Sequence, residues 1–169
     1  IRETTSVLYR EVLEKDMLRG RSIEGMATAA LYAGSRLENA PRTLDEVAAV
    51  SRVDKLEIER TYRYLADELA LEMAPTDPEA YIARFASQLE CPDEMERRSR
   101  ELTQAAVEAG VHSGRNPVGI AASALYAAAK LTNQDVIQDD LADIANVSKV
   151  TIRNRYTEIL EAADEVSSG

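Results

Sequence analysis

The chain has 169 residues, 45% of them hydrophobic, enough for one large or two small domains with a buried core. Its apolar runs are too short for a membrane span of about 20 residues, and no pattern of a secretion signal is seen at its start. Its single cysteine, Cys91, excludes an intramolecular disulfide and fits a reducing, cytoplasmic location. The net charge of −10 is unfavourable for binding nucleic acid, but sixteen of the twenty basic residues are arginines. This lysine-poor, acidic balance fits either a protein of a very salty cell interior, where charges are screened within about 3 Å at 1 M salt, or an ordinary acidic cytosolic protein.

The first half of the chain predicts four helices. Residues 3–18 form the first, with Leu8 paired to Val12 and Leu13 to Met17. Residues 22–37 form an amphipathic second helix with a small-residue face suited to close packing at the centre of a bundle, and its helical spacing joins Ile23, Met26, Ala27, Ala30 and Leu31. Thr43 to Glu46 is a capping box that starts a short third helix. Asp54 caps the fourth, which carries Ile58, Tyr62, Leu65 and Leu69.

Residues 72–78 contain two prolines and are the best linker candidate, so the predicted domains are residues 1–74 and 75–169. Pro78 occupies the first position of a new helix with Asp77 as its cap, and Tyr81, Phe85 and Leu89 line one face of it. Cys91 is predicted to cap the next helix, over residues 92–109. The remaining helices are expected at 117–131, 139–146 and 148–165.

An internal repeat dominates the sequence. Residues 20–37 and 114–131 share nine of 18 positions, and the offset of 94 continues without a gap from the pair Val7/Glu101 to the pair Leu65/Ile159 with 18 identities in 59 pairs. A period this long indicates a duplicated helical domain rather than a solenoid of short units. The second copy has a helix, 78–90, whose counterpart in the first would lie before Ile1, so the first copy is expected to be one helix short.

Each copy ends in a pattern typical of a helix-turn-helix. In residues 139–156 an apolar short helix leads through a turn at residues 146–148 into a second helix on which Ile152, Tyr156 and Ile159 face inward. Lys149, Val150, Arg153 and Asn154 then lie at the exposed N-terminal end, where a recognition helix reaches base edges in the major groove. No acid occurs between Ile144 and Thr157. The competing interpretation is a solvated face of an ordinary helix pair.

The first copy differs at the equivalent place, because residues 52–63 mix basic side chains with three acids. This segment suits a protein partner or marginal backbone contact. No catalytic or phosphate-binding motif is present. His112 is expected in a turn, Cys91 is not expected to act as a nucleophile, and Asp139 and Asp140 are expected to be cap and surface residues rather than metal ligands.

The runs ALYAGSRL, PRTLDEVAAVSRVDKLEI, PTDPEAYIARFASQL and VTIRNRY resemble the core of archaeal transcription factor B, the counterpart of eukaryotic transcription factor IIB. The resemblance covers essentially the whole chain. It implies an all-α fold of two tandem cyclin-like repeats, each normally of five helices, with the first repeat lacking its first helix. It also implies binding to the complex of TATA-binding protein with promoter double-stranded DNA, recruitment of RNA polymerase, and no enzymatic activity.

The resemblance also implies roles for particular residues. The second helix-turn-helix should read the element upstream of the TATA box through Val150 and Arg153, with Lys149, Thr151 and Asn154 beside them. Arg21 matches a position near downstream DNA, and Arg115 is its equivalent in the second repeat. The basic residues that should meet TATA-binding protein are Arg36, Arg42, Arg52 and Lys55.

The family's N-terminal zinc ribbon and the linker that enters the polymerase have no counterpart in the 169 residues. We therefore expect no cofactor here, zinc being confined to the ribbon, and expect polymerase recruitment only in a full-length protein. The acidic, lysine-poor composition indicates a salt-loving archaeon. A cyclin-like protein-interaction module without DNA binding is the alternative function, and a helical hydrolase built on Asp139 and Asp140 is a distant third.

Overall fold

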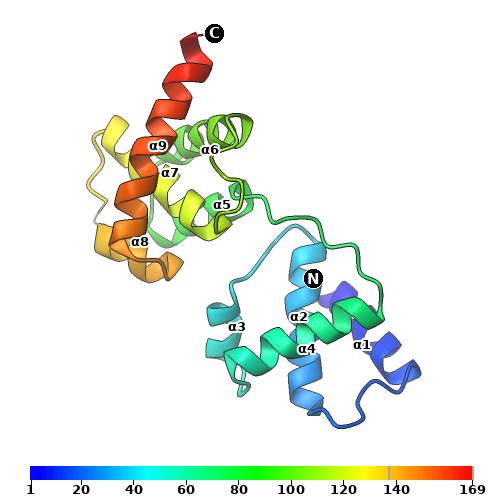
Figure 1. Ribbon diagram of the computed structural model, residues 1–169. Helices are drawn as coiled ribbons and strands as arrows, with labels where there is room; N and C mark the ends of the chain where they lie inside the picture. Colours follow the sequence, from blue (N-terminus) through cyan, green and yellow to red (C-terminus); the bar gives the residue numbers. More distant parts are fainter. Residues whose placement is uncertain (137, 169) are drawn as a thin grey trace. The chain divides into compact units, whose positions relative to one another are not determined.

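The structure, a computed structural model, describes residues 1–136 and 138–168 (Figure 1). In this part of the chain all regular secondary structure is helical, as predicted, and no helix in it is long and apolar enough to cross a lipid bilayer. The chain divides into two compact units, Ile1–Thr76 and Asp77–Gly169. The boundary predicted from the prolines lay between residues 74 and 75.

Unit 1 contains four helices, α1 (Arg2–Glu14), α2 (Ile23–Leu37), α3 (Leu44–Val50) and α4 (Lys55–Glu68). Helix α2 contacts the other three. Two apolar clusters hold the unit together. One joins α1, α2 and α4 and includes Val12, Met26 and Leu65; the other joins α3 to α4 through Val47 and Ile58.

The capping signals at the helix starts of unit 1 are confirmed. The Glu46 N–H donates to Thr43 Oγ1 at 3.1 Å, and Glu46 Oε2 accepts from the Thr43 N–H at 2.7 Å, which completes the capping box of α3. Asp54 accepts a hydrogen bond from the Leu56 N–H at 2.9 Å and caps α4. These local interactions start the two helices of the first helix-turn-helix where the sequence placed them.

Two expectations for unit 1 are wrong. The first helix ends at Glu14 rather than residue 18, because Asp16 takes a left-handed conformation (φ 53°) and the Met17 N–H turns back to the Val12 carbonyl. Met17 is buried all the same, whereas Leu13 is 52% exposed.

The small-residue face predicted for α2 is confirmed, but three of the residues expected on it are not buried. Ile23 is 66% exposed, Leu31 is 38% exposed and Ala27 lies at the surface. The buried residues other than Met26 are mostly small: Gly25, Thr28, Ala29, Ala30, Ala33, Gly34 and Ser35. Since α2 has neighbours on several sides, small side chains allow close backbone approach. A Cβ on Gly34, for example, would lie 2.6 Å from Thr5 Oγ1 of α1.

Unit 2 contains five helices, α5 (Glu79–Gln88), α6 (Asp93–Glu108), α7 (Pro117–Leu131), α8 (Gln138–Ala145) and α9 (Lys149–Ser168). Helix α7 contacts all four others, and every residue from Val118 to Ala129 is buried. Phe85 of α5 is fully buried and stacks on Tyr81 at a centroid distance of 5.8 Å. Because α5 has no counterpart among the residues of unit 1, the difference of one helix between the copies is confirmed.

The start of α5 lies one residue later than predicted. Pro78 precedes the first helical residue, and the Asp77 carboxylate accepts from the Glu79 N–H at 2.9 Å. The predicted cap role of Cys91 is wrong, since Pro92 occupies the N-cap position of α6 without a side-chain bond. The Cys91 N–H instead donates to the Ala86 carbonyl at 2.8 Å and closes the end of α5.

The repeat is visible in the packing as well as in the sequence. Tyr32 of α2 meets Tyr62 of α4 edge-to-face at 4.9 Å and 85°. The residues 94 positions later, Tyr126 of α7 and Tyr156 of α9, meet in the same way at 5.1 Å and 84°. The same aromatic pair thus fixes the central helix of each unit against its last helix.

Candidate nucleic-acid interface

The helix-turn-helix of unit 2 consists of α8, a short turn and α9. The turn reverses at Asn146, whose φ of 49° is tolerated by asparagine better than by most residues. The Val147 N–H donates back to the Ala142 carbonyl at 3.1 Å and closes the end of α8. Ser148 Oγ then accepts from the Thr151 N–H at 3.1 Å, so a serine hydroxyl begins α9.

The rotation of α9 about its axis is fixed by its apolar residues. Ile152 and Ile159 are fully buried, as their spacing predicted, and Tyr156 packs half-buried against Tyr126. The side chains between them on the helix surface therefore face outward. Val150 is 63% exposed, and Arg153 and Asn154 are exposed. An aliphatic, a guanidinium and an amide group are thus presented together on the first two turns.

Lys149 makes an ion pair that the sequence analysis did not predict. Its ammonium group is ion-paired with Asp139 of α8. In unit 1 the equivalent Lys55 Nζ lies 2.8 Å from both carboxylate oxygens of Asp45 on α3. In each helix-turn-helix a lysine of the second helix is thus ion-paired with an aspartate of the first helix. The detectable signal was the identity of both residues at the offset of 94.

Arg115 and Thr151 meet at one end of α7, although 36 positions separate them in the chain. Both line a hollow of about 250 Å³ together with Gly119 and Arg155. Arg115 and Arg155 are both ion-paired with Glu158, the latter at 3.1 Å. Sequence reasoning missed the proximity of Arg155 to Arg115. Periodicity does not reveal this proximity, because it depends on how α9 crosses α7.

In unit 1 two of the predicted contact arginines are engaged within the unit. The Arg21 guanidinium lies over the ring of Tyr64 at 3.4 Å from its centroid. Arg36 donates to the Tyr62 hydroxyl at 2.6 Å and to the Ala74 carbonyl at 3.1 Å. These contacts hold each guanidinium in a defined place.

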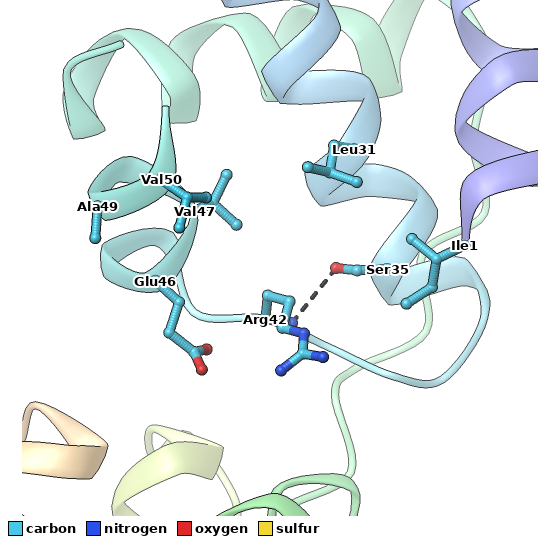
Figure 2. A pocket seen from close by; sticks show the side chains of 8 residues that line it. All are labelled: Ile1, Leu31, Ser35, Arg42, Glu46, Val47, Ala49 and Val50. Carbon is cyan, nitrogen blue, oxygen red and sulfur yellow. Dashed lines mark hydrogen bonds between the residues drawn. The ribbon is translucent and has the colours of Figure 1, made fainter. Parts of the chain in front are cut away.

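The other three predicted contact residues of unit 1, Arg42, Arg52 and Lys55, lie close to the ends of α3 in the sequence. Arg52 is exposed, and Lys55 is paired with Asp45 as described above. Arg42 lines an apolar hollow of about 580 Å³ between α2 and α3 (Figure 2). Its backbone N–H donates to Ser35 Oγ at 3.4 Å, and Leu31 and Val47 lie on opposite sides of the hollow.

Helix α4, the second helix of the helix-turn-helix in unit 1, presents a different surface from α9. Leu56, 60% exposed, stands at the position of Val150. Glu59 stands at the position of Arg153 and is paired with Arg63 at 2.5 Å. A carboxylate at this position would be repelled by the phosphates that line a DNA groove, so the two helix-turn-helix elements are chemically unequal.

The candidate reactive residues offer no catalytic arrangement. Burial, and to a lesser extent the nearby Glu96 carboxylate, raise the pKa of the Cys91 thiol, which disfavours the nucleophilic thiolate. His112 lies in the turn between α6 and α7. Asp139 and Asp140 are exposed on α8. Among the residues that the structure describes, no three histidine, cysteine or acidic side chains are grouped as metal ligands would be.

The fold and this site define a class: all-α proteins of two tandem cyclin-like repeats, each ending in a helix-turn-helix. Comparison with family models gives the particular family. Residues 1–68 and 71–162 match the Transcription factor TFIIB repeat. The chain belongs to this family, whose members are transcription factors and not enzymes.

Curated relatives agree over nearly the whole chain. It is 61% identical over 165 residues to "Transcription initiation factor IIB 4" of Halobacterium salinarum, an alignment that covers 98% of the chain and 50% of the relative. It is 57% identical over 164 residues to "Transcription initiation factor IIB 2" of Haloferax volcanii, covering 97% and 49%. A third, "Transcription initiation factor IIB" of Methanococcus maripaludis strain C7, is 52% identical over 164 residues, covering 97% and 48%. The chain thus spans about half the length of these archaeal relatives, each of which is named a transcription initiation factor.

Proposed function

We propose that this chain binds the complex of TATA-binding protein with promoter double-stranded DNA, and that α9 reads the element upstream of the TATA box in the major groove. The observation that carries the proposal is the exposed start of α9. Val150, Arg153 and Asn154 project from it while Ile152 and Ile159 anchor it, and no acid occurs between Ile144 and Thr157.

The three exposed side chains have complementary partners on base edges. A valine methyl suits the methyl group of thymine, an arginine suits guanine, and an asparagine suits adenine. Lys149 and Thr151 lie on the same turn, where they are suited to backbone phosphates. Lys149 is held by Asp139, so contact with a phosphate requires it to exchange one anionic partner for another.

Unit 1 is proposed to hold TATA-binding protein rather than to read DNA. Its basic candidates are Arg36, Arg42, Arg52 and Lys55, and Glu59 occupies the position where α9 has its arginine. Arg21 is proposed to lie near downstream DNA, with its guanidinium plane supported by Tyr64. Unequal use of the two units would orient the complex on the promoter, because only one of them reads sequence.

Recruitment of RNA polymerase is proposed for a full-length protein and not for these 169 residues alone. Binding of the promoter complex by the two units is proposed to need no metal or cofactor. A chelator should therefore leave complex formation by this chain unchanged, whereas a zinc-dependent loss of the complex would contradict this part of the proposal.

The test is a gel shift with TATA-binding protein and a duplex that contains a TATA box. The chain should produce a slower band than TATA-binding protein alone, and a scrambled upstream sequence should weaken that band. A ternary band insensitive to the upstream sequence would contradict groove reading by α9. The absence of any ternary band would contradict the function as a whole.

The alternative is a cyclin-like protein-interaction module that does not bind DNA. The exposed Leu56 and the acids of unit 1 favour it for that unit. Two results together would establish this alternative. The chain would bind TATA-binding protein equally well with and without DNA, and it would leave the upstream bases unprotected in footprinting.

A further inference from the structure

The hollow at the start of α7 is the feature from which we draw a further inference. It has a volume of about 250 Å³ and lies where the 114–116 segment and the first turn of α7 meet α9. Since one water molecule takes up about 30 Å³ in the liquid, a tetrahedral oxyanion and a few waters fit in it.

The hollow carries two guanidinium groups that share one carboxylate. Arg115 and Arg155 are both paired with Glu158, and the side chains of the two arginines are only 31% and 30% exposed. The three groups together leave a net positive charge. Two half-buried arginines that share one carboxylate form an arrangement that also suits a phosphate group.

A backbone donor at the same place has no acceptor within its own helix. The Val118 N–H donates to Asn116 Oδ1 at 3.0 Å, and the Ile120 N–H donates to the Asn116 carbonyl at 3.2 Å. Gly119, between them, is buried and lines the hollow. Its N–H is one of the first donors of α7, which have no acceptor within the helix, and such N–H groups favour an anion.

Unit 1 shows what belongs at this place. There the Gly25 N–H donates to Ser22 Oγ at 2.9 Å, and Ser22 Oγ donates to Glu57 Oε1 at 2.8 Å. A Cβ added to Gly25 would lie 2.7 Å from the same Glu57 oxygen. Unit 1 therefore carries its own anion over the first turn of its central helix.

Unit 2 lacks that anion. The residue 94 positions after Glu57 is Thr151, whose hydroxyl and methyl groups leave the first turn of α7 open. A Cβ on Gly119 would meet Thr151 Cγ2 at 3.4 Å and Val147 Cγ1 at 4.0 Å, both ordinary contact distances and neither of them to an anion. The carboxylate of unit 1 thus has no equivalent in unit 2, and its place is bordered by two arginines instead.

We propose that this hollow binds one phosphodiester group of the DNA backbone, and that Glu158 is a built-in competitor for it. The Gly119 N–H donates to the phosphate, and so does the Thr151 hydroxyl, which can accept from Ser148 Oγ at 2.9 Å. Arg115 and Arg155 transfer their pairing from Glu158 to the phosphate. The proposal rests on the proposed function of unit 2. It adds a phosphate seat, a role for Arg155 and a carboxylate that weakens binding.

The test compares two variants with opposite expected signs in ternary-complex assays. Arg155→Gln should weaken binding to the same extent on every upstream sequence and lower the slope of log affinity against log salt concentration by about 0.9, the value for one phosphate contact. Glu158→Gln should bind about two- to fivefold more tightly than the unchanged chain, because the competing carboxylate is removed. A gain in affinity is not explained by misfolding.

The chain offers a matched control. Glu101 of α6 also pairs with two arginines, Arg97 at 2.5 Å and Arg98 at 2.8 Å, but these arginines do not line the hollow. Glu101→Gln makes the same change in net charge as Glu158→Gln. It should leave affinity nearly unchanged if the effect of Glu158 is local, and an equal gain in both variants would overturn the competitor role.

The other outcomes are also decisive. If the unchanged chain forms no ternary complex, the proposed function fails and the phosphate seat fails with it. If it forms the complex but Arg155→Gln has the same affinity and salt slope, only the phosphate seat is overturned. If Arg155→Gln weakens binding on some upstream sequences and not on others, Arg155 reads bases and the hollow is not a phosphate seat.

Discussion

Replacing Arg153 by alanine is the sharpest test of how α9 would read DNA. Arg153 is exposed on the outer face of α9, so Arg153→Ala should change the free energy of unfolding by no more than about 0.5 kcal/mol. An arginine paired with one guanine contributes roughly 1–3 kcal/mol of discrimination. The preference at one upstream base pair should therefore fall by about 5- to 150-fold, since 1.4 kcal/mol is tenfold.

The assay is fluorescence anisotropy with TATA-binding protein and a set of duplexes that differ at single upstream base pairs. Lys149→Met is the comparison, because Lys149 lies one turn earlier and is paired with Asp139. Losing that exposed ion pair should cost only about 0.2–1 kcal/mol of stability. Lys149→Met should weaken binding equally on all duplexes and lower the salt slope by about 0.9, if Lys149 contacts a phosphate.

One result would refute the reasoning about α9. If Arg153→Ala weakens binding by the same factor on every duplex and leaves the preferred upstream base pair unchanged, Arg153 does not read a base. Far-ultraviolet circular dichroism and thermal unfolding of the variant should match the unchanged chain, which separates loss of contact from loss of fold.

Three further predictions concern other parts of the chain. Arg52→Glu should abolish the ternary complex if unit 1 holds TATA-binding protein, and unchanged gel-shift affinity would remove Arg52 from that interface. Thr43→Ala removes a helix cap worth about 0.5–2 kcal/mol, so hydrogen exchange of the α3 amides should accelerate by about 2- to 30-fold. An unchanged exchange rate would mean that the capping box does not limit local unfolding of α3. The raised pKa of the Cys91 thiol leaves less thiolate at a given pH. Iodoacetamide should therefore modify Cys91 more slowly in the folded chain than in the urea-unfolded chain at pH 8, and the rate for the folded chain should reach half its maximum at a higher pH. Faster modification of the folded chain would contradict the effect of burial.

Much of the fold could be predicted because its signals are local. The caps at Thr43 and Asp54 act within three residues of themselves, and the left-handed turn at Asn146 lies between two recognisable helices. The repeat multiplied this information, since each helix of one copy supports its counterpart in the other. The inward side of α9 followed from the spacing of Ile152 and Ile159.

The errors arose where a residue's surroundings come from several elements. Ile23 and Leu31 have the spacing of an inward face, yet both are exposed, because α2 is packed on its small residues by α1 and α4. Cys91 precedes a helix but instead closes the one before it. Periodicity describes one helix at a time and does not state how many neighbours that helix has.

The sequence by itself determined the duplication, the helices and the outward side of α9, because these depend on spacing, capping and composition along one stretch of chain. Only the tertiary structure decided which charges are already paired. It placed Lys149 on Asp139 and directed Arg115 and Arg155 to Glu158. It also set Glu57 over Gly25 in one unit and left Gly119 open in the other. The physical reason is that an ion pair depends on a few ångströms between helices, and those distances follow from how the helices cross.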